Sequence, residues 1–259
     1  MDRVNDEPGR TDWSVTRVVG LVRTLFSPVS RRRISEGRTG KALFAFSLCF
    51  ALYHVLGQGV FYAPIDLHLT IHLCGVLALS FLLFGSRAST HRLVPFTDIV
   101  LAIACLLVAL FLAGSLDRLL LRALVITPLS TQEIVVAGAL LLLLFEASRR
   151  TVGLTFVIIM LGFILVMYCG PWLPGIWAHA GIGLVDILDL TVWTRLQGLW
   201  AIPLRMSATL IALFIIFGKL VQYSGLTQLF TAVCQALAGG ARGGPAKIAV
   251  IGSGLVGSV

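Results

Sequence analysis

Residues 239–259 read GGARGGPAKIAVIGSGLVGSV, and the interpretation of this stretch decides the fold. From Lys247 onward a β-branched run leads into Gly252, Gly254 and Gly257, which have the G-x-G-x-x-G spacing of a dinucleotide-binding turn. The same glycines are also typical of the broken entry to a membrane-embedded helix, where transporters build ion sites. The two interpretations are incompatible, and the residues upstream distinguish them.

Composition favours the membrane. Hydrophobic residues make up 58% of the 259 residues and charged residues only 12%, whereas about a quarter of a typical soluble domain is charged. This chain has too little polar surface to cover a globule of its size. The composition therefore argues against a soluble enzyme or a soluble binding module.

Six apolar stretches are long enough to cross a bilayer, which takes about 20 residues for about 30 Å of hydrocarbon. They are 42–60, 67–85, 96–114, 131–147, 152–170 and 201–222. Lys, Arg, Asp and Glu are absent from the centres of these stretches, which argues against a proton relay or a voltage sensor. We expect an all-α membrane protein with about six transmembrane helices and additional amphipathic helices.

The formal net charge of +8 is concentrated near the N-terminus, where residues 1–41 hold nine of the 20 Lys and Arg. A basic arm of this kind could bind nucleic acid. Ahead of an apolar run, however, it favours a cytoplasmic end that faces anionic lipid. Lys and Arg are also more frequent in 86–95, in 148–151 and after residue 222 than in the alternate loops. The positive-inside rule therefore predicts a cytoplasmic N-terminus and six crossings.

Two further segments have an apolar stripe at helical spacing. Residues 13–26 suit an interfacial helix on the inner leaflet, with a partly disordered arm as the alternative. Residues 225–238 carry no charge, so we expect that helix to pack against protein. In the outer loop 171–200, four tryptophans suit either an aromatic belt or a partner-docking surface. They are Trp172, Trp177, Trp193 and Trp200.

Patterns for catalysis and metal binding are weak. His68 and His72 share a helix face near Asp66, but no other motif completes a metal site, so interfacial hydrogen bonding is the favoured role. Ser253 is not in a nucleophile elbow, and Lys247 is not in a phosphate-binding loop because Ile248 follows it. We expect no enzymatic activity, no cofactor and no bound structural metal.

Three short segments have a recognisable pattern. Residues 146–153 read EASRRTVG, residues 169–175 read CGPWLPG, and residues 243–250 read GGPAKIAV. They resemble, in this order, the E-A-x-R-R-x-x-G signature, the G-P-x-L-P-G turn and the G-G-P-A-K-x-A-V element of one family. This family is the fused permeases of tripartite ATP-independent periplasmic (TRAP) transporters, of the type paired with TAXI-class binding proteins. The likeness covers about 42–259.

The resemblance implies a division into three parts. These are a basic cytoplasmic tail (1–41), a four-helix domain like the small subunit (42–148), and the N-terminal part of the large permease subunit (149–259). Members of the family continue for several hundred residues beyond this point. The chain is therefore expected to be truncated within its most functional element, and the remaining permease portion is a possible partner.

The resemblance also implies a function, namely sodium-driven symport of an organic acid across the bacterial inner membrane. A periplasmic TAXI-type binding protein would deliver the substrate, and Na⁺ would be the coupling ion. The glycine run would form the start of a re-entrant helical hairpin that holds ion and substrate. Its candidate residues are Gly243, Gly244, Pro245, Gly252, Ser253, Gly254, Gly257 and Ser258.

Two alternatives stay open beside this hypothesis. The glycines could serve close helix packing, in which case the chain would be a structural scaffold subunit or an inactive fragment. A membrane-tethered dinucleotide enzyme is the other alternative, and it rests on the glycine spacing alone.

Overall fold

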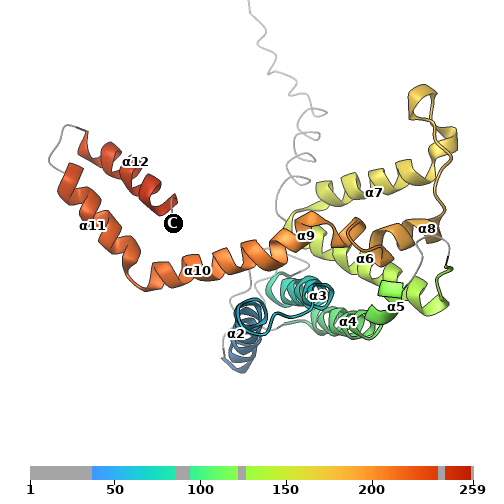
Figure 1. Cartoon of the computed structure of the whole chain (residues 1–259), viewed down its shortest axis with the longest axis horizontal. Coiled ribbons are helices and arrows are strands. Elements are labelled where there is room, and N and C mark those ends of the chain that lie inside the picture. The colour runs from blue at the N-terminus through green and yellow to red at the C-terminus, as the bar shows by residue number, and fades with distance from the viewer. Residues whose placement is uncertain (1–36, 86–93, 122–126, 239–242, 258–259) are drawn as a thin grey trace, which may run out of the picture. The chain divides into compact units, whose positions relative to one another are not determined.

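The computed structural model describes residues 37–85, 94–121, 127–238 and 243–257, and its regular structure is helical (Figure 1). Within these ranges no β-strand is present. The expected all-α membrane fold is therefore confirmed. The predicted interfacial helix at 13–26 and most of the basic tail lie outside the described residues.

The described residues form α-helices and, between α7 and α10, short 3₁₀ and π-helical turns. The α-helices are α2 (Gly37–Gly59), α3 (Ile65–Leu83), α4 (Phe96–Gly114), α5 (Leu116–Leu121), α6 (Thr131–Thr151), α7 (Leu154–Tyr168), α8 (Leu184–Leu188), α9 (Ile202–Met206), α10 (Ala212–Tyr223), α11 (Leu226–Ala238) and α12 (Gly244–Gly257). The 3₁₀ turns are η1 (Gly170–Trp172), η2 (Gly175–Trp177) and η4 (Gly198–Trp200), and the π-helical turns are η3 (Asp189–Trp193) and η5 (Ser207–Ile211).

Among the described residues, five helical stretches are long and apolar enough to span a membrane. They are α2, α3, α4, α6 and residues 202–223, where α9, η5 and α10 form one continuous helix. Each coincides with a stretch predicted from the sequence, and α4 has the predicted bounds of 96–114. The periodic apolar pattern was therefore sufficient to place these helices.

The fifth predicted span, 152–170, is wrong in length, because the structure has there the 15-residue helix α7. Gly153 has a left-handed φ of 118° and separates α7 from α6. At the other end the helix stops at Tyr168, and Pro171, which has no N–H to donate, lies in the 3₁₀ turn that follows. The described residues thus contain five helices of spanning length and one shorter apolar helix.

The chain divides into two compact units, one formed by residues 1–50 and 63–204 and the other by residues 51–62 and 205–259. In the described part of the first unit, α3, α4 and α6 pack on one another. Ala78, Ala102 and Ala137 are buried on these helices, and small side chains of this kind let helix backbones approach closely. The fully buried apolar residues of this core include Leu69, Cys74, Phe81, Cys105, Ala137 and Leu140. The opposite face of α4 stays exposed, as a lipid-facing surface does.

Arg150 lies at one end of this core and connects all three helices. Its Nη1 donates to Asp98 Oδ1 on α4 at 2.8 Å and to the carbonyl of Phe84, the residue after α3, at 3.3 Å. Its Nε donates to Glu146 Oε1 at 2.7 Å within α6, and its guanidinium carbon lies 5.0 Å from the centre of the Phe81 ring. Arg150 is 3% exposed and Asp98 is fully buried. The pair is desolvated, but each polar group has a partner.

The helix dipoles favour this arrangement. Asp98 lies in the first turn of α4 and Arg150 in the last turn of α6, where each charge is opposite in sign to the helix end that carries it. Glu146 also accepts two bonds of 2.8 Å from Arg149. Residues 146–153 therefore form an ion network, which is followed by the left-handed Gly153 between α6 and α7.

A second ionic cluster lies at the other end of α6. Ser130 and Glu133 form a capping box, and Arg118 on α5 binds the Glu133 carboxylate at 2.7 Å. The indole N–H of Trp193 donates to the Glu133 carbonyl at 3.2 Å. This cluster attaches α5 and η3 to the start of α6.

The aromatic-belt expectation is wrong for two of the four loop tryptophans. Trp193 and Trp200 are 3% and 6% exposed, and the Trp200 indole donates to the Val192 carbonyl. Both indole N–H groups have backbone acceptors, so these side chains can be buried without an unpaired donor. Trp172 and Trp177 remain exposed.

We predict that Arg150→Leu lowers the free energy of unfolding by about 3 kcal/mol, because it leaves the Asp98 carboxylate buried without its cation. The matched control is Arg149→Leu, which removes a cation that is 33% exposed and pairs with Glu146; its cost should stay below about 1 kcal/mol. Loss of helical circular dichroism during titration with a denaturing detergent measures both. Equal costs for the two variants would contradict a special role for Arg150.

Candidate functional site

The candidate hairpin residues lie in the second unit, where α11 and α12 pack side by side (Figure 1). Gly225, with φ of 82°, separates α10 from α11, and the N–H of Leu229 donates to its carbonyl at 3.0 Å. Cys234 on α11 is fully buried, whereas Leu229 and Val233 are 57% and 41% exposed. The helix expected at 225–238 is confirmed, and part of its apolar surface is uncovered in the described residues.

Gly243, Gly244 and Pro245 form the start of α12. Gly243 has a left-handed φ of 76°, and its carbonyl accepts the N–H groups of Ala246 and Lys247, both at 3.1 Å. Pro245 follows in the first turn, where a helix does not need its missing N–H. This G-G-P element is therefore a helix entry, as the hypothesis of a hairpin turn requires.

The remaining glycines of the run lie inside α12. Gly252, Ser253, Gly254 and Gly257 belong to one continuous helix, and Ser258 lies outside the described residues. The Ser253 hydroxyl donates to the Val250 carbonyl at 2.9 Å. In this conformation the backbone does not leave the helix at Gly252–Gly254, which differs from the broken helix that is typical of an ion site. The helical hydrogen bonds outweigh the cost of about 1 kcal/mol for each glycine.

The dinucleotide-binding interpretation does not fit this geometry. That motif needs a β-strand before the first glycine and a turn at the glycines themselves. Residues 244–251 are instead helical, and Gly252 and Gly254 continue the same helix. The G-x-G-x-x-G spacing in this chain is therefore a property of a glycine-rich helix.

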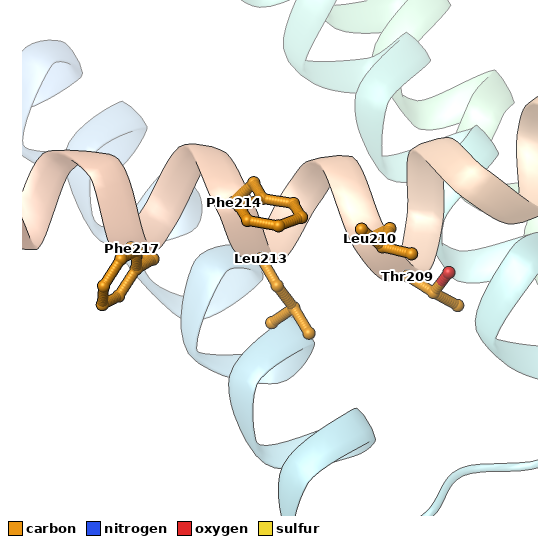
Figure 2. Close-up of a pocket in the computed structure, with 5 residues that line it drawn as sticks. All are labelled: Thr209, Leu210, Leu213, Phe214 and Phe217. Carbon is orange, nitrogen blue, oxygen red and sulfur yellow. The ribbon is translucent and has the colours of Figure 1, made fainter. Parts of the chain in front are cut away.

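An open groove lies along the middle of the helix 202–223 in the same unit. Figure 2 shows its lining, and its volume is about 360 Å³. The lining residues are Thr209, Leu210, Leu213, Phe214 and Phe217. The Thr209 hydroxyl donates to the carbonyl of Arg205 at 2.8 Å, and no ionisable side chain is among these lining residues. The groove suits an apolar chain or helix, and its lining carries no charged side chain.

Arg205 is a residue that the sequence analysis did not single out. It lies inside the predicted span 201–222, directly before the π-helical turn η5. Its Nε is buried and has no hydrogen-bond partner in the described structure. A planar guanidinium is well suited to bind a carboxylate. An arginine within an apolar span, followed by Ser207 and Thr209, was the available sequence signal.

Asp66, His68 and His72, which were considered as metal ligands, make other contacts in the structure. The Asp66 carboxylate is paired with Arg195, and His72 stacks on Phe50 with ring centres 6.2 Å apart. His68 is fully buried on the same helix. Among the described residues no three His, Cys, Asp or Glu side chains are grouped as metal ligands. Asp66 instead connects the start of α3 to the segment that follows η3.

Comparison with known families adds one match. The family model described as "Tripartite ATP-independent periplasmic transporter, DctM component" matches residues 139–259. This segment is therefore similar to a TRAP permease domain. It extends from the middle of α6 through α7, the helix 202–223, α11 and α12. No curated protein and no solved structure matches the chain.

The TRAP match points to a transporter and not to an enzyme, and a TRAP permease works with a periplasmic binding protein. Together with the five apolar helices, it identifies a multi-pass membrane protein. The candidate residues Gly243–Gly257, the groove and Arg205 all lie inside the matched segment.

Two glycines of this segment should respond to substitution with opposite signs. Gly243→Ala forces a left-handed backbone on a residue with a side chain and should destabilise the entry to α12 by about 1–2 kcal/mol. Gly254→Ala meets no atom within 4 Å and should stabilise the helix by up to about 1 kcal/mol. Hydrogen exchange of the α12 amides measures both. Destabilisation by Gly254→Ala would show that the glycine is needed for packing.

Proposed function

We propose that this chain is the membrane permease component of a sodium-coupled, binding-protein-dependent TRAP transporter for organic acids. The observation that carries the proposal is the TRAP permease match over residues 139–259, which includes the glycine-rich helix α12. Apolar helices of spanning length provide the membrane location that such a permease requires.

The glycine content of α12 supports an ion-binding role for residues 252–257. Gly252, Gly254 and Gly257 lie within six residues at the end of α12, and each weakens the helix by about 1 kcal/mol relative to alanine. This is the part of α12 that unwinds most easily. Unwinding would free carbonyl groups, and the Ser253 hydroxyl stands beside them as a further oxygen ligand. Oxygen atoms of this kind bind Na⁺ at broken helices in transporters.

Arg205 supports an anionic substrate. Its guanidinium lies in an apolar span, and its Nε is buried with a free hydrogen-bonding capacity. Organic acids carry the carboxylate that such a group binds best. Inward movement of one positive charge gains about 2.3 kcal/mol per 100 mV, so several Na⁺ ions can drive the uptake of an accompanying anion.

The proposed orientation places the N-terminus in the cytoplasm of a bacterium and the chain in its inner membrane. The basic tail and the arginines at the end of α6 favour the cytoplasmic side under the positive-inside rule. The partner is a periplasmic TAXI-type binding protein, which the sequence resemblance implies.

A scaffold role without transport is the competing proposal. The observation that favours it is the unbroken helix over Gly244–Gly257, since a packing helix needs no unwinding. The two proposals differ in whether the chain itself moves an organic acid.

Uptake by proteoliposomes distinguishes them. The full chain is reconstituted with a TAXI-type binding protein and ¹⁴C-labelled succinate and glutamate as probe acids, under an inward Na⁺ gradient or a K⁺ gradient. We expect uptake only with Na⁺ and only with the binding protein. Equal uptake in K⁺ would refute sodium coupling, and a folded chain that moves neither acid under any condition would support the scaffold role.

Stiffening α12 tests the role of the glycines directly. Gly254→Ala should reduce the initial rate of sodium-driven uptake about fivefold if the helix must open there, since the substitution stabilises the closed helix by about 1 kcal/mol and about 1.4 kcal/mol corresponds to a factor of ten. Gly218→Ala on α10 is the matched control, because a side chain added at that glycine also meets nothing within 4 Å. Unchanged uptake in Gly254→Ala would remove the ion hairpin from the proposal.

A further inference from the structure

The segment between α7 and α8 stands out beyond the helices of the first unit (Figure 1). We call residues 170–182 the aromatic arm. The arm presents its largest apolar side chains outward, since Trp172, Ile176 and Trp177 are 75%, 96% and 68% exposed. The proposed transport mechanism gives this surface no role, and the described residues do not cover it.

The arm is closed at its base and does not behave as an open loop. The N–H of Ile182 donates to the Met167 carbonyl at 2.9 Å, and the N–H of His179 donates to the Gly170 carbonyl at 3.2 Å. The His179 ring contacts the Val166 carbonyl through Nε2 and accepts the N–H of Gly181 at Nδ1, both at 3.1 Å. A side chain on Gly170 would come within 2.3 Å of that ring. The arm is therefore held in one shape.

Most backbone donors of the arm are used internally. Trp172 and Leu173 donate to Cys169 and Gly170 within η1, and Trp177 and Ala178 donate to Pro174 and Gly175 within η2. Pro171 and Pro174 have no N–H. Irregular backbone can lie in a membrane, where little water is present, only when its polar groups form hydrogen bonds within the protein in this way. This arm meets that requirement more fully than an ordinary surface loop needs to.

The absence of charged residues indicates what kind of surface the arm contacts. Residues 169–183 contain no Lys, Arg, Asp or Glu. A docking surface for another protein usually has a polar or charged rim, whereas tryptophans on a neutral apolar surface are typical of the membrane interface. The neighbouring helix also favours the membrane interface. The arm directly follows α7, and because only Val157 of α7 is buried, most of that helix is exposed as a lipid-facing helix would be.

The length of α7 explains why the arm is needed. At about 1.5 Å per residue its 15 residues extend only about 22 Å, and the hydrocarbon layer is about 30 Å thick. A short helix leaves a mismatch that flanking residues at the interface compensate. The arm begins where the helix ends and supplies apolar surface over the missing distance.

We propose that the aromatic arm lies in the lipid interface and completes the membrane crossing that α7 begins. Trp172, Ile176 and Trp177 contact lipid, and His179 is the positioning residue that holds the arm in shape. This inference needs only the membrane location of the chain and does not depend on transport. Its failure and the failure of the transport proposal are therefore separate results.

Depth-dependent quenching of tryptophan fluorescence tests the proposal. The full chain and the Trp172→Phe/Trp177→Phe double variant are reconstituted in phosphatidylcholine vesicles brominated either near the headgroup or near the chain ends. The difference between their emissions reports on the arm. We expect it to be shifted to shorter wavelength, to lose most of its intensity with the shallow bromine and to lose little with the deep bromine.

Aqueous iodide and a second pair of variants complete the test. Quenching of the difference emission by iodide and not by bromine would place the arm in water, and quenching by neither would mean that protein covers it; either result overturns the proposal. Ile176→Asp should shift the arm emission to longer wavelength and expose it to iodide, whereas Ile176→Leu should leave it unchanged. No difference between these two variants would also overturn the proposal.

Discussion

The buried guanidinium of Arg150 is the interaction on which the first unit depends. Three helices that cross the core in alternating directions bring one set of ends together there, and Arg150 binds a side chain or carbonyl group from each of them. A buried ion pair stabilises little compared with apolar packing of the same volume, but its loss is costly. Its effect is to fix which helix ends meet, because any other register would leave the Asp98 carboxylate in an apolar environment without a cation.

This arrangement separates two tasks along the helices. The ends carry charge and define the neighbours, through Arg150 at one end and Glu133 with Arg118 at the other. The middle is apolar, and its outward faces are left to lipid. In a bilayer the hydrophobic effect does not drive helices together, so close packing and polar contacts at the ends have to supply the specificity. In the second unit, by contrast, the long helix 202–223 is largely uncovered in the described residues.

The helices could be predicted from the sequence because a bilayer imposes a length and an apolar composition that local sequence reveals. The bounds of α4 and the existence of α3 and α6 follow from that rule alone. The burial of Trp193 and Trp200 could not be predicted, because it depends on which backbone carbonyl accepts each indole N–H in the folded chain. The length of α7 also escaped prediction, since an apolar run continues past Tyr168 while the backbone changes from an α-helix to 3₁₀ turns. The candidate glycines were found by composition, but their conformation depends on a balance of about 1 kcal/mol per residue that spacing does not encode.

The π-helical turn η5 has a geometric consequence for the long helix that contains it. A π turn accommodates one residue more than an α-helical turn, and one residue corresponds to roughly 100° of rotation at 3.6 residues per turn. The side chains of α10 are therefore out of phase with those of α9, although the helix continues through both. A helical wheel drawn through residues 202–223 as one uniform helix would assign Arg205 and the groove residue Phe217 to the wrong relative faces. The surface that this helix offers to lipid turns about its axis at Ser207–Ile211.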